Sequence, residues 1–216
     1  RFSVLIMQRP LSRLIRSPAL CGLLLLCLLG TAPARATTLL VLGDSISAAY
    51  GMSLEEGWVA LLERRLAGRT PPVTVINASI SAETTGGALR RLPQLLVTHE
   101  PDVVLIELGG NDGLRAIPPE EIRRNLENIV ELAQETGASA LITGIMIPPN
   151  YGSEYITAFR RAFQQAADST GVPLTPFVLE EIAPKPGMMQ EDGIHPTAEA
   201  QPLIVDNLWP WIEPML

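Results

Sequence analysis

The sequence has few of the residues that build disulfides, thiol sites and metal centres. Its 216 residues include two cysteines and two histidines. Both cysteines, Cys21 and Cys27, lie within the first 36 residues, so residues 37–216 can form neither a disulfide nor a thiol nucleophile. Residues 37–216 contain no cysteine and only two histidines, His99 and His195, and these do not have the spacing of zinc ligands. We therefore expect no metal site.

Positive charge is scarce once the first 36 residues are set aside. The chain has 16 basic and 23 acidic side chains, and five of the arginines fall within residues 1–36, which contain no acid. The remaining 180 residues keep 11 basic and 23 acidic side chains, a net charge of −12. Such an acidic surface repels a phosphate backbone. We expect no nucleic acid among the partners.

The first 36 residues have the pattern of a secretory signal peptide. A basic start is followed by an apolar run over residues 19–30 and then by Ala34-Arg35-Ala36. The run is shorter than the ~20 residues of a membrane-spanning helix, and small residues suit a signal peptidase. We predict that residues 1–36 are removed, leaving a single domain, residues 37–216, in the periplasm or secreted. An uncleaved membrane anchor is the disfavoured alternative.

Short apolar runs alternate with helical patterns along residues 37–216. The five runs are Thr37–Leu42, Val73–Ile76, Val103–Leu108, Ala140–Ile145 and Val172–Thr175. The helical patterns are Thr85–Val97, Glu120–Glu135, Tyr155–Asp168 and Thr197–Trp209, the first and last interrupted by Pro93 and Pro202, where we expect a kink or a restart. Alternation of this kind implies parallel strands joined by right-handed crossovers. We predict an α/β protein, a three-layer α/β/α sandwich with a five-stranded parallel sheet.

Three loops contain residues capable of chemistry. In an open parallel sheet, function gathers in loops beyond the carboxyl ends of the strands. Each loop alone is typical of an ordinary turn or helix cap. The three are Gly43-Asp44-Ser45 after the first strand, Gly109-Gly110-Asn111-Asp112 after the third, and Asp192-Gly193-Ile194-His195-Pro196 before the last helix.

Together these loops supply the groups needed for acyl transfer. A serine hydroxyl is a weak nucleophile until an imidazole removes its proton, and a carboxylate must hold that imidazole in the correct tautomer. An aspartate three residues before a histidine can reach it locally. We therefore interpret Ser45 as the nucleophile, His195 as the general base and then acid, and Asp192 as the residue that orients His195.

The same loops, with Asn77-Ala78-Ser79-Ile80-Ser81, resemble the ordered sequence blocks of the GDSL, or SGNH, hydrolases. The resemblance spans nearly all of residues 37–216. It is strongest to the bacterial periplasmic branch described as thioesterase I, lysophospholipase and arylesterase. Two further stretches share in it, Ile106-Glu107-Leu108-Gly109-Gly110-Asn111-Asp112-Gly113-Leu114-Arg115 and Pro148-Pro149-Asn150-Tyr151-Gly152.

The resemblance implies a flavodoxin-like sheet and an oxyanion hole with three donors. These map to the backbone N–H of Ser45, the backbone N–H of Ala82 and the side chain of Asn111. The second donor is usually a glycine in the family, so Ala82 is a departure. If the position requires a positive φ, alanine is strained there. We expect that Ala82→Gly leaves activity equal or higher.

The function implied is that of a serine hydrolase without a cofactor, cleaving carboxylic esters and thioesters, lysophospholipids included, through an acyl-enzyme. We expect a monomer that binds small-molecule substrates, with no stable membrane anchor after cleavage of the signal. The substrate cleft is predicted along residues 114–119 and 147–151. Its candidate binding residues are Gly110, Leu114, Pro149 and Tyr151.

Two other functions are compatible with these loops. A carbohydrate acetylesterase would use the same catalytic residues but prefer acetyl to longer acyl groups. A noncatalytic binding module would use Ser45 and Asn111 only as hydrogen-bonding groups. The presence of both Asp192 and His195 argues against the binding module, because a binder has little need of an acid and a base in this arrangement.

Overall fold

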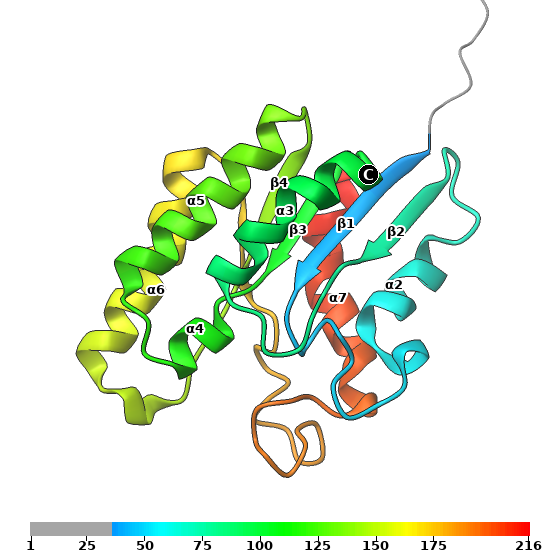
Figure 1. Ribbon diagram of the computed structural model, residues 1–216. Coiled ribbons are helices and arrows are strands. Elements are labelled where there is room, and N and C mark those ends of the chain that lie inside the picture. Colours follow the sequence, from blue (N-terminus) through cyan, green and yellow to red (C-terminus); the bar gives the residue numbers. More distant parts are fainter. Residues whose placement is uncertain (1–35) are drawn as a thin grey trace, which may run out of the picture. The chain divides into compact units, whose positions relative to one another are not determined.

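The computed structural model describes residues 36–216 (Figure 1). The predicted signal peptide therefore lies, except for Ala36, outside the described residues. The described part contains a five-stranded sheet in the order β2-β1-β3-β4-β5, with every neighbouring pair parallel. The strands are β1 Thr37–Gly43, β2 Val73–Asn77, β3 Val103–Glu107, β4 Ser139–Gly144 and β5 Leu174–Phe177. The predicted parallel sheet is confirmed, with strand ends shifted by at most two residues.

Helices cover both faces of this sheet, which confirms the three-layer prediction. One face packs against α3, α5 and α6, and the other against α2 and α7 (Figure 1). The α-helices are α2 Trp58–Leu66, α3 Thr85–His99, α4 Gly110–Leu114, α5 Pro119–Glu135, α6 Ser153–Thr170 and α7 Gln201–Ile212. Short 3-10 helices are η1 Leu54–Glu56, η2 Pro149–Tyr151, η3 Ala198–Ala200 and η4 Glu213–Met215.

Strand β1 shows why the core divides into two layers. Successive side chains of a strand point to opposite faces. Leu39 and Val41 pack with α2 and α7, whereas Leu40 and Leu42 pack with α3 and α5. All four are fully buried. A strand covered on both faces is apolar throughout, which is why the sequence shows a continuous apolar run there.

The two prolines that interrupt helical patterns have different positions in the structure. Helix α3 runs through Pro93 as one helix from Thr85 to His99. Helix α7 begins at Gln201, directly after η3, so Pro202 stands in its first turn. Proline is tolerated there because the first N–H groups of a helix have no partner within the helix. The expected restart is therefore the actual beginning of the α-helix.

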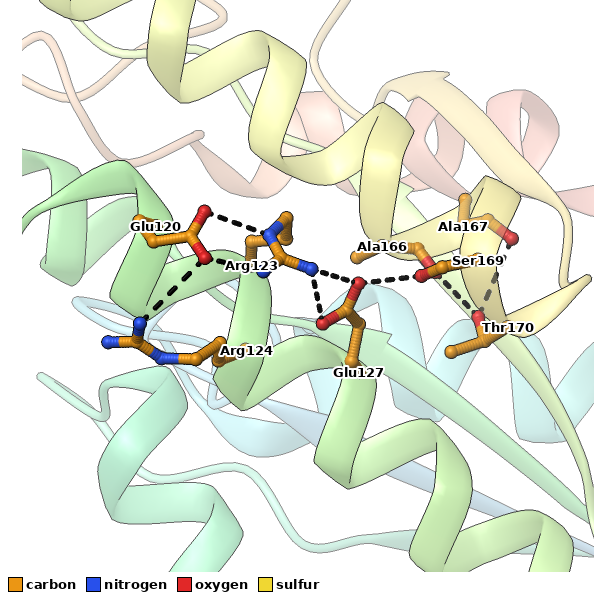
Figure 2. A network of polar contacts seen from close by, with 8 residues as sticks. All are labelled: Glu120, Arg123, Arg124, Glu127, Ala166, Ala167, Ser169 and Thr170. Carbon is orange, nitrogen blue, oxygen red and sulfur yellow. Dashed lines mark hydrogen bonds and ion pairs between the residues drawn. The ribbon is translucent and has the colours of Figure 1, made fainter.

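A polar network joins α5 to α6 along their solvent side (Figure 2). Arg123 is held between Glu120 and Glu127 on α5, and Glu127 accepts a hydrogen bond from Ser169 of α6 at 2.6 Å. The side chains of Arg123 and Glu127 are partly buried. The network therefore fixes the two helices against each other on the outside of the sheet.

The strand order places the candidate site. Strand β2 lies beside β1 at one edge of the sheet, whereas β3 lies on the opposite side of β1. Such a switch point leaves a crevice beyond the carboxyl ends of the two central strands. The loops after β1 and β3 meet at this crevice, and they contain Ser45 and Asn111. Among residues 36–216 no helix has both the length and the apolar character to cross a bilayer.

Candidate active site

Ser45 stands at the carboxyl end of β1, two residues beyond the last strand residue, Gly43. It is 9% exposed, and its neighbour Asp44 is 3% exposed. The Asp44 carboxylate accepts the backbone N–H of Ile46 at 3.1 Å, which holds the turn. A Cβ at Gly43 would lie 2.6 Å from the side chain of Ser47. Glycine is therefore required for the chain to fold back this tightly.

The three residues selected from the sequence as a catalytic group lie in one hydrogen-bonded chain. His195 Nε2 is 2.9 Å from Ser45 Oγ, although the two residues are 150 positions apart. His195 Nδ1 is 2.6 Å from Asp192 Oδ2. The other carboxylate oxygen of Asp192 accepts the backbone N–H groups of Ile194 and His195 at 2.9 and 3.0 Å.

The backbone around Asp192 keeps this carboxylate charged. The backbone N–H of His195, followed by its side chain, lowers the pKa of Asp192 to about 2. Asp192 is therefore an anion at neutral pH and can only accept hydrogen bonds. An acceptor at Nδ1 favours the tautomer in which Nε2 is free to take a proton from Ser45.

Asn111 lies in the first turn of α4 and faces the same crevice. Its Nδ2 donates to Asp44 Oδ2 at 3.1 Å. A carboxylate accepts and does not donate, so this contact orients the amide with its NH₂ group toward Asp44. The amide has two N–H bonds, and only one is used by Asp44. Asn111 can thus offer a second donor to a negatively charged oxygen beside Ser45.

Ala82, the proposed backbone donor, has a φ of 64°. This is the left-handed region, which alanine occupies at a cost of about 1–2 kcal/mol and glycine without one. Its carbonyl oxygen accepts a hydrogen bond from Arg115 at 3.1 Å. The strain foreseen for an alanine at this position is therefore present in the backbone.

Two buried carboxyl groups lie beneath the nucleophile. Burial raises the pKa of Asp44 to about 6. Glu107, at the end of β3, is fully buried, and its burial, together with the charge of Asp44, raises its pKa well above the usual value. Its Oε2 accepts the Ser47 hydroxyl at 2.7 Å, whereas Oε1 has no hydrogen-bond partner among the described residues. The pair therefore favours one neutral carboxyl group over two charges.

A cavity of about 260 Å³ opens beside Ser45 and His195. Its walls are mostly apolar, and Gly110 and Leu114 line it as predicted binding residues. The other two predicted binding residues, Pro149 and Tyr151, do not line it, and Pro148 does. The Tyr151 hydroxyl donates to the Leu114 carbonyl at 2.8 Å. The other apolar side chains of the wall are Ile46, Ile145, Met146, Ile147, Phe177, Leu179, Ala183, Met189 and Ile194.

Sequence reasoning missed Glu107 as part of the site. The signal was present, since Glu107 is an acid within the apolar run of the third strand. A charged residue in a strand covered on both faces must be neutralised or paired. The described residues contain no group of three or more His, Cys, Asp and Glu side chains placed to hold a metal ion.

Comparison with known proteins agrees with this geometry. The profile of the GDSL-like Lipase/Acylhydrolase family matches residues 41–202. Esterase TesA of Pseudomonas aeruginosa is 49% identical over 202 residues, which cover 94% of this chain and all of that protein. Thioesterase 1/protease 1/lysophospholipase L1 of Escherichia coli is 44% identical over 193 residues, covering 89% of this chain and 91% of that protein.

A solved structure of a related esterase is similar to this chain in three dimensions as well. The psychrotrophic esterase EstA of a Pseudoalteromonas species, inhibited by monoethylphosphonate, superposes with a TM-score of 0.79 at 46% identity. The match covers 82% of this chain and 97% of that one. The resemblance read from the sequence blocks is confirmed. The chain belongs to the GDSL-like lipase/acylhydrolase family.

Proposed function

We propose that this protein is a serine hydrolase that cleaves carboxylic esters and thioesters through an acyl-enzyme. The observation that carries the proposal is the continuous chain from Ser45 Oγ through His195 to the Asp192 carboxylate at the mouth of an apolar cavity. The names of the relatives, esterase and thioesterase 1/lysophospholipase L1, support the same chemistry.

The reaction follows from the placement of these groups. Ser45 Oγ attacks the carbonyl carbon while His195 Nε2 takes the hydroxyl proton, and Asp192 stabilises the imidazolium that forms. Asn111 and the backbone N–H groups of Ser45 and Ala82 hold the negative oxygen of the tetrahedral intermediate. As the carbon–oxygen or carbon–sulfur bond breaks, His195 returns the proton to the leaving alcohol or thiol. Water then attacks the acyl carbonyl while His195 Nε2 takes its proton. The bond from Ser45 Oγ to the acyl carbon breaks, and His195 returns the proton to Ser45 as the acid leaves.

The substrate follows from the cavity. The aliphatic and methionine side chains of the cavity suit an acyl chain. Because the cavity is open on one side, it can accept esters with different alcohol or thiol leaving groups. A volume of about 260 Å³ is small for a ligand pocket, so it encloses the part of the acyl group next to the ester, and a longer chain would extend through the open side. Small aryl esters, acyl thioesters and lysophospholipids are the substrate classes we propose, with the protein acting as a monomer and without a cofactor.

A panel of nitrophenyl esters and acyl-CoA thioesters of increasing chain length tests this function, with Ser45→Ala as the matched control. We expect turnover of several esters and loss of that turnover in Ser45→Ala. A steep preference for acetyl over octanoyl esters would instead favour the carbohydrate acetylesterase. Saturable binding without turnover would contradict the hydrolase and favour a binding module.

The processing of the chain is a separate proposal. We infer that residues 1–36 form a signal peptide and that the domain of residues 37–216 acts in the periplasm or outside the cell. The basic start, the short apolar run and the small residues at the cleavage point support it. Fractionation of expressing bacteria followed by N-terminal sequencing should find a protein that begins at Thr37. A protein retained with its first 36 residues would contradict the inference.

A further inference from the structure

The segment that presents His195 has little regular structure of its own. Residues 178–197, between β5 and η3, consist of turns, bends and one isolated bridge between Met189 and Pro196. Within it the backbone N–H of Gln190 donates to the His195 carbonyl at 2.8 Å, which closes the loop on itself. Residues 178–182 anchor the start of the segment in the hydrophobic core. The placement of its end relative to Ser45 also involves contacts with the loop after β1.

One side chain bridges these two loops. The Gln190 amide nitrogen donates to the carbonyl oxygen of Tyr50 at 2.8 Å and to that of Pro196 at 3.0 Å. Tyr50 belongs to the Ser45 loop, since its backbone N–H donates to the Ser45 carbonyl at 3.0 Å. Pro196 directly follows His195. The carboxamide therefore ties the backbone beside the nucleophile to the backbone beside the base.

Gly51 provides the space in which this carboxamide lies. Its φ is +77°, and a Cβ added there would be 2.5 Å from Gln190 Oε1 and 3.0 Å from Nε2. The atoms in the way are the end of a flexible side chain. A methyl group at Gly51 would therefore push the carboxamide off its two carbonyls, in addition to the backbone strain of a side chain at a positive φ.

A second contact acts on the imidazole itself. The ring of Tyr50 faces the His195 ring with centroids 4.2 Å apart and planes inclined by 32°. Tyr50 is 49% exposed, so its ring covers the solvent side of the imidazole instead of filling the core. Offset aromatic pairs at this distance restrain the orientation of both rings.

We propose that Gln190 and Tyr50 are positioning residues of the reaction. The Gln190 carboxamide sets the position of the His195 segment against the Ser45 loop, and the Tyr50 ring sets the plane of the imidazole. This inference rests on the proposed function. A displacement of about 1 Å between reacting groups can cost on the order of 10² in rate. The contacts of Gln190 and Tyr50 should thus appear in kcat more than in KM.

The test of the Gln190 contact is a double-mutant cycle of Gln190→Ala and Gly51→Ala in the full-length protein. The measurements are kcat and KM on a nitrophenyl ester, the rate constant of inactivation by a fluorophosphonate, and the melting temperature. We expect each single variant to lower kcat and the inactivation rate by about 10- to 100-fold, with KM within about threefold. The double variant should be no slower than Gln190→Ala, because the methyl group acts through a carboxamide that is already absent.

Two control variants separate positioning from a structural effect. Gly68→Ala introduces alanine at a φ of +83° with no atom within 4 Å of the new Cβ. It should lower the melting temperature about as much as Gly51→Ala and leave kcat unchanged. Gln134→Ala removes a glutamine of α5 whose amide also donates to a backbone carbonyl, that of Thr170 in α6. It should leave kcat and the inactivation rate unchanged.

The Tyr50 contact is tested by Tyr50→Ala and Tyr50→Phe. The alanine variant should lower kcat, and the phenylalanine variant should restore it to within about twofold, because the contact is made by the ring. A kcat of Gln190→Ala within twofold of the unmodified protein would overturn the inference, as would additive effects of Gln190→Ala and Gly51→Ala. Absence of turnover in the unmodified protein would overturn the proposed function and this inference with it.

Discussion

The two halves of the active site are supported in different ways. Ser45 and Asn111 directly follow buried strands, and the carboxyl group between them, Asp44, is 3% exposed. Asp192 and His195 belong to a segment of turns, and the Asp192 side chain is 39% exposed. The nucleophile half thus follows directly on the buried sheet, whereas the base half belongs to a turn segment that reaches the core mainly through residues 178–182 and is otherwise held by backbone turns and side-chain contacts.

This difference has a consequence for mutations. In the nucleophile half, a substitution alters buried charge and packing, so stability should change as well as activity, upward or downward. In the base half, a substitution removes an exposed contact, so activity should fall with little change in stability.

Asp192→Asn should have the largest effect among them. The variant keeps an oxygen for the two backbone N–H groups but no longer selects the productive tautomer of His195, so kcat should fall by about 10³ to 10⁴. Its melting temperature should fall only modestly, because the hydrogen bonds that lower the pKa of Asp192 lose their charge assistance but the side chain is partly exposed. Steady-state kinetics and thermal unfolding check both parts. A kcat within tenfold of the original would show that Asp192 does not orient His195.

Asn111→Ala should have the next largest effect, in the nucleophile half. Removal of one oxyanion donor lowers kcat by about 10² to 10³. KM should change little, since the interaction strengthens only in the transition state. Kinetics on a single nitrophenyl ester measure it. A rise in KM with an unchanged kcat would instead place Asn111 in ground-state binding.

Asp44→Asn should separate activity from stability in that same half. Burial raises the pKa of Asp44 to about 6 in the folded protein, above its unfolded value of 3.8. Its contribution to stability is therefore fully present below pH 3.8 and is lost as pH rises through 6. A neutral amide avoids this loss, so the variant should gain in melting temperature relative to the unmodified protein between pH 4 and pH 7.5.

The same variant should be less active. Asparagine can donate as well as accept, so it no longer forces Asn111 to present its NH₂ group, and kcat should fall by less than in Asn111→Ala. Thermal unfolding at the two pH values and kinetics at pH 7.5 test the pair of effects. A gain in stability that is equal at both pH values would show that the charge of Asp44 is not its cause.

Ala82→Gly should have the smallest effect on activity. Glycine adopts a φ of 64° without strain and retains the backbone N–H, so kcat should be equal or slightly higher. Steady-state kinetics of the variant and of the unmodified protein on the same ester test this prediction. A large loss of activity would show that the donor has been assigned to the wrong residue.

Much of the fold is readable from the sequence because strands covered on both faces need continuous apolar runs. All five strands were placed within two residues for this reason. Helix α2, Trp58–Leu66, was not anticipated, since it has only nine residues and its last turn is charged. The three side chains Ser45, Asp192 and His195 could be selected because their chemistry is tied to residue type and to local spacing.

The supporting contacts could not be selected in this way. Gln190 reaches Tyr50 across 140 positions of sequence, and no local pattern indicates that two loops so far apart share a carboxamide. Tyr151 is a second case, since the sequence does not indicate that its hydroxyl donates to the Leu114 carbonyl and that it does not line the cavity. The resemblance to the family implied the flavodoxin-like strand order that the structure has, but contacts between loops depend on side-chain packing that no local pattern indicates.

The most direct test of the account is to locate the residue that a fluorophosphonate modifies. A serine that meets an imidazole base reacts with such a reagent, whereas an ordinary serine does not. We predict that peptide mass spectrometry finds the label on Ser45, that His195→Ala slows the labelling, and that Ser45→Ala abolishes it together with turnover. Label on a different serine, or turnover by the protein without any label at Ser45, would contradict the account.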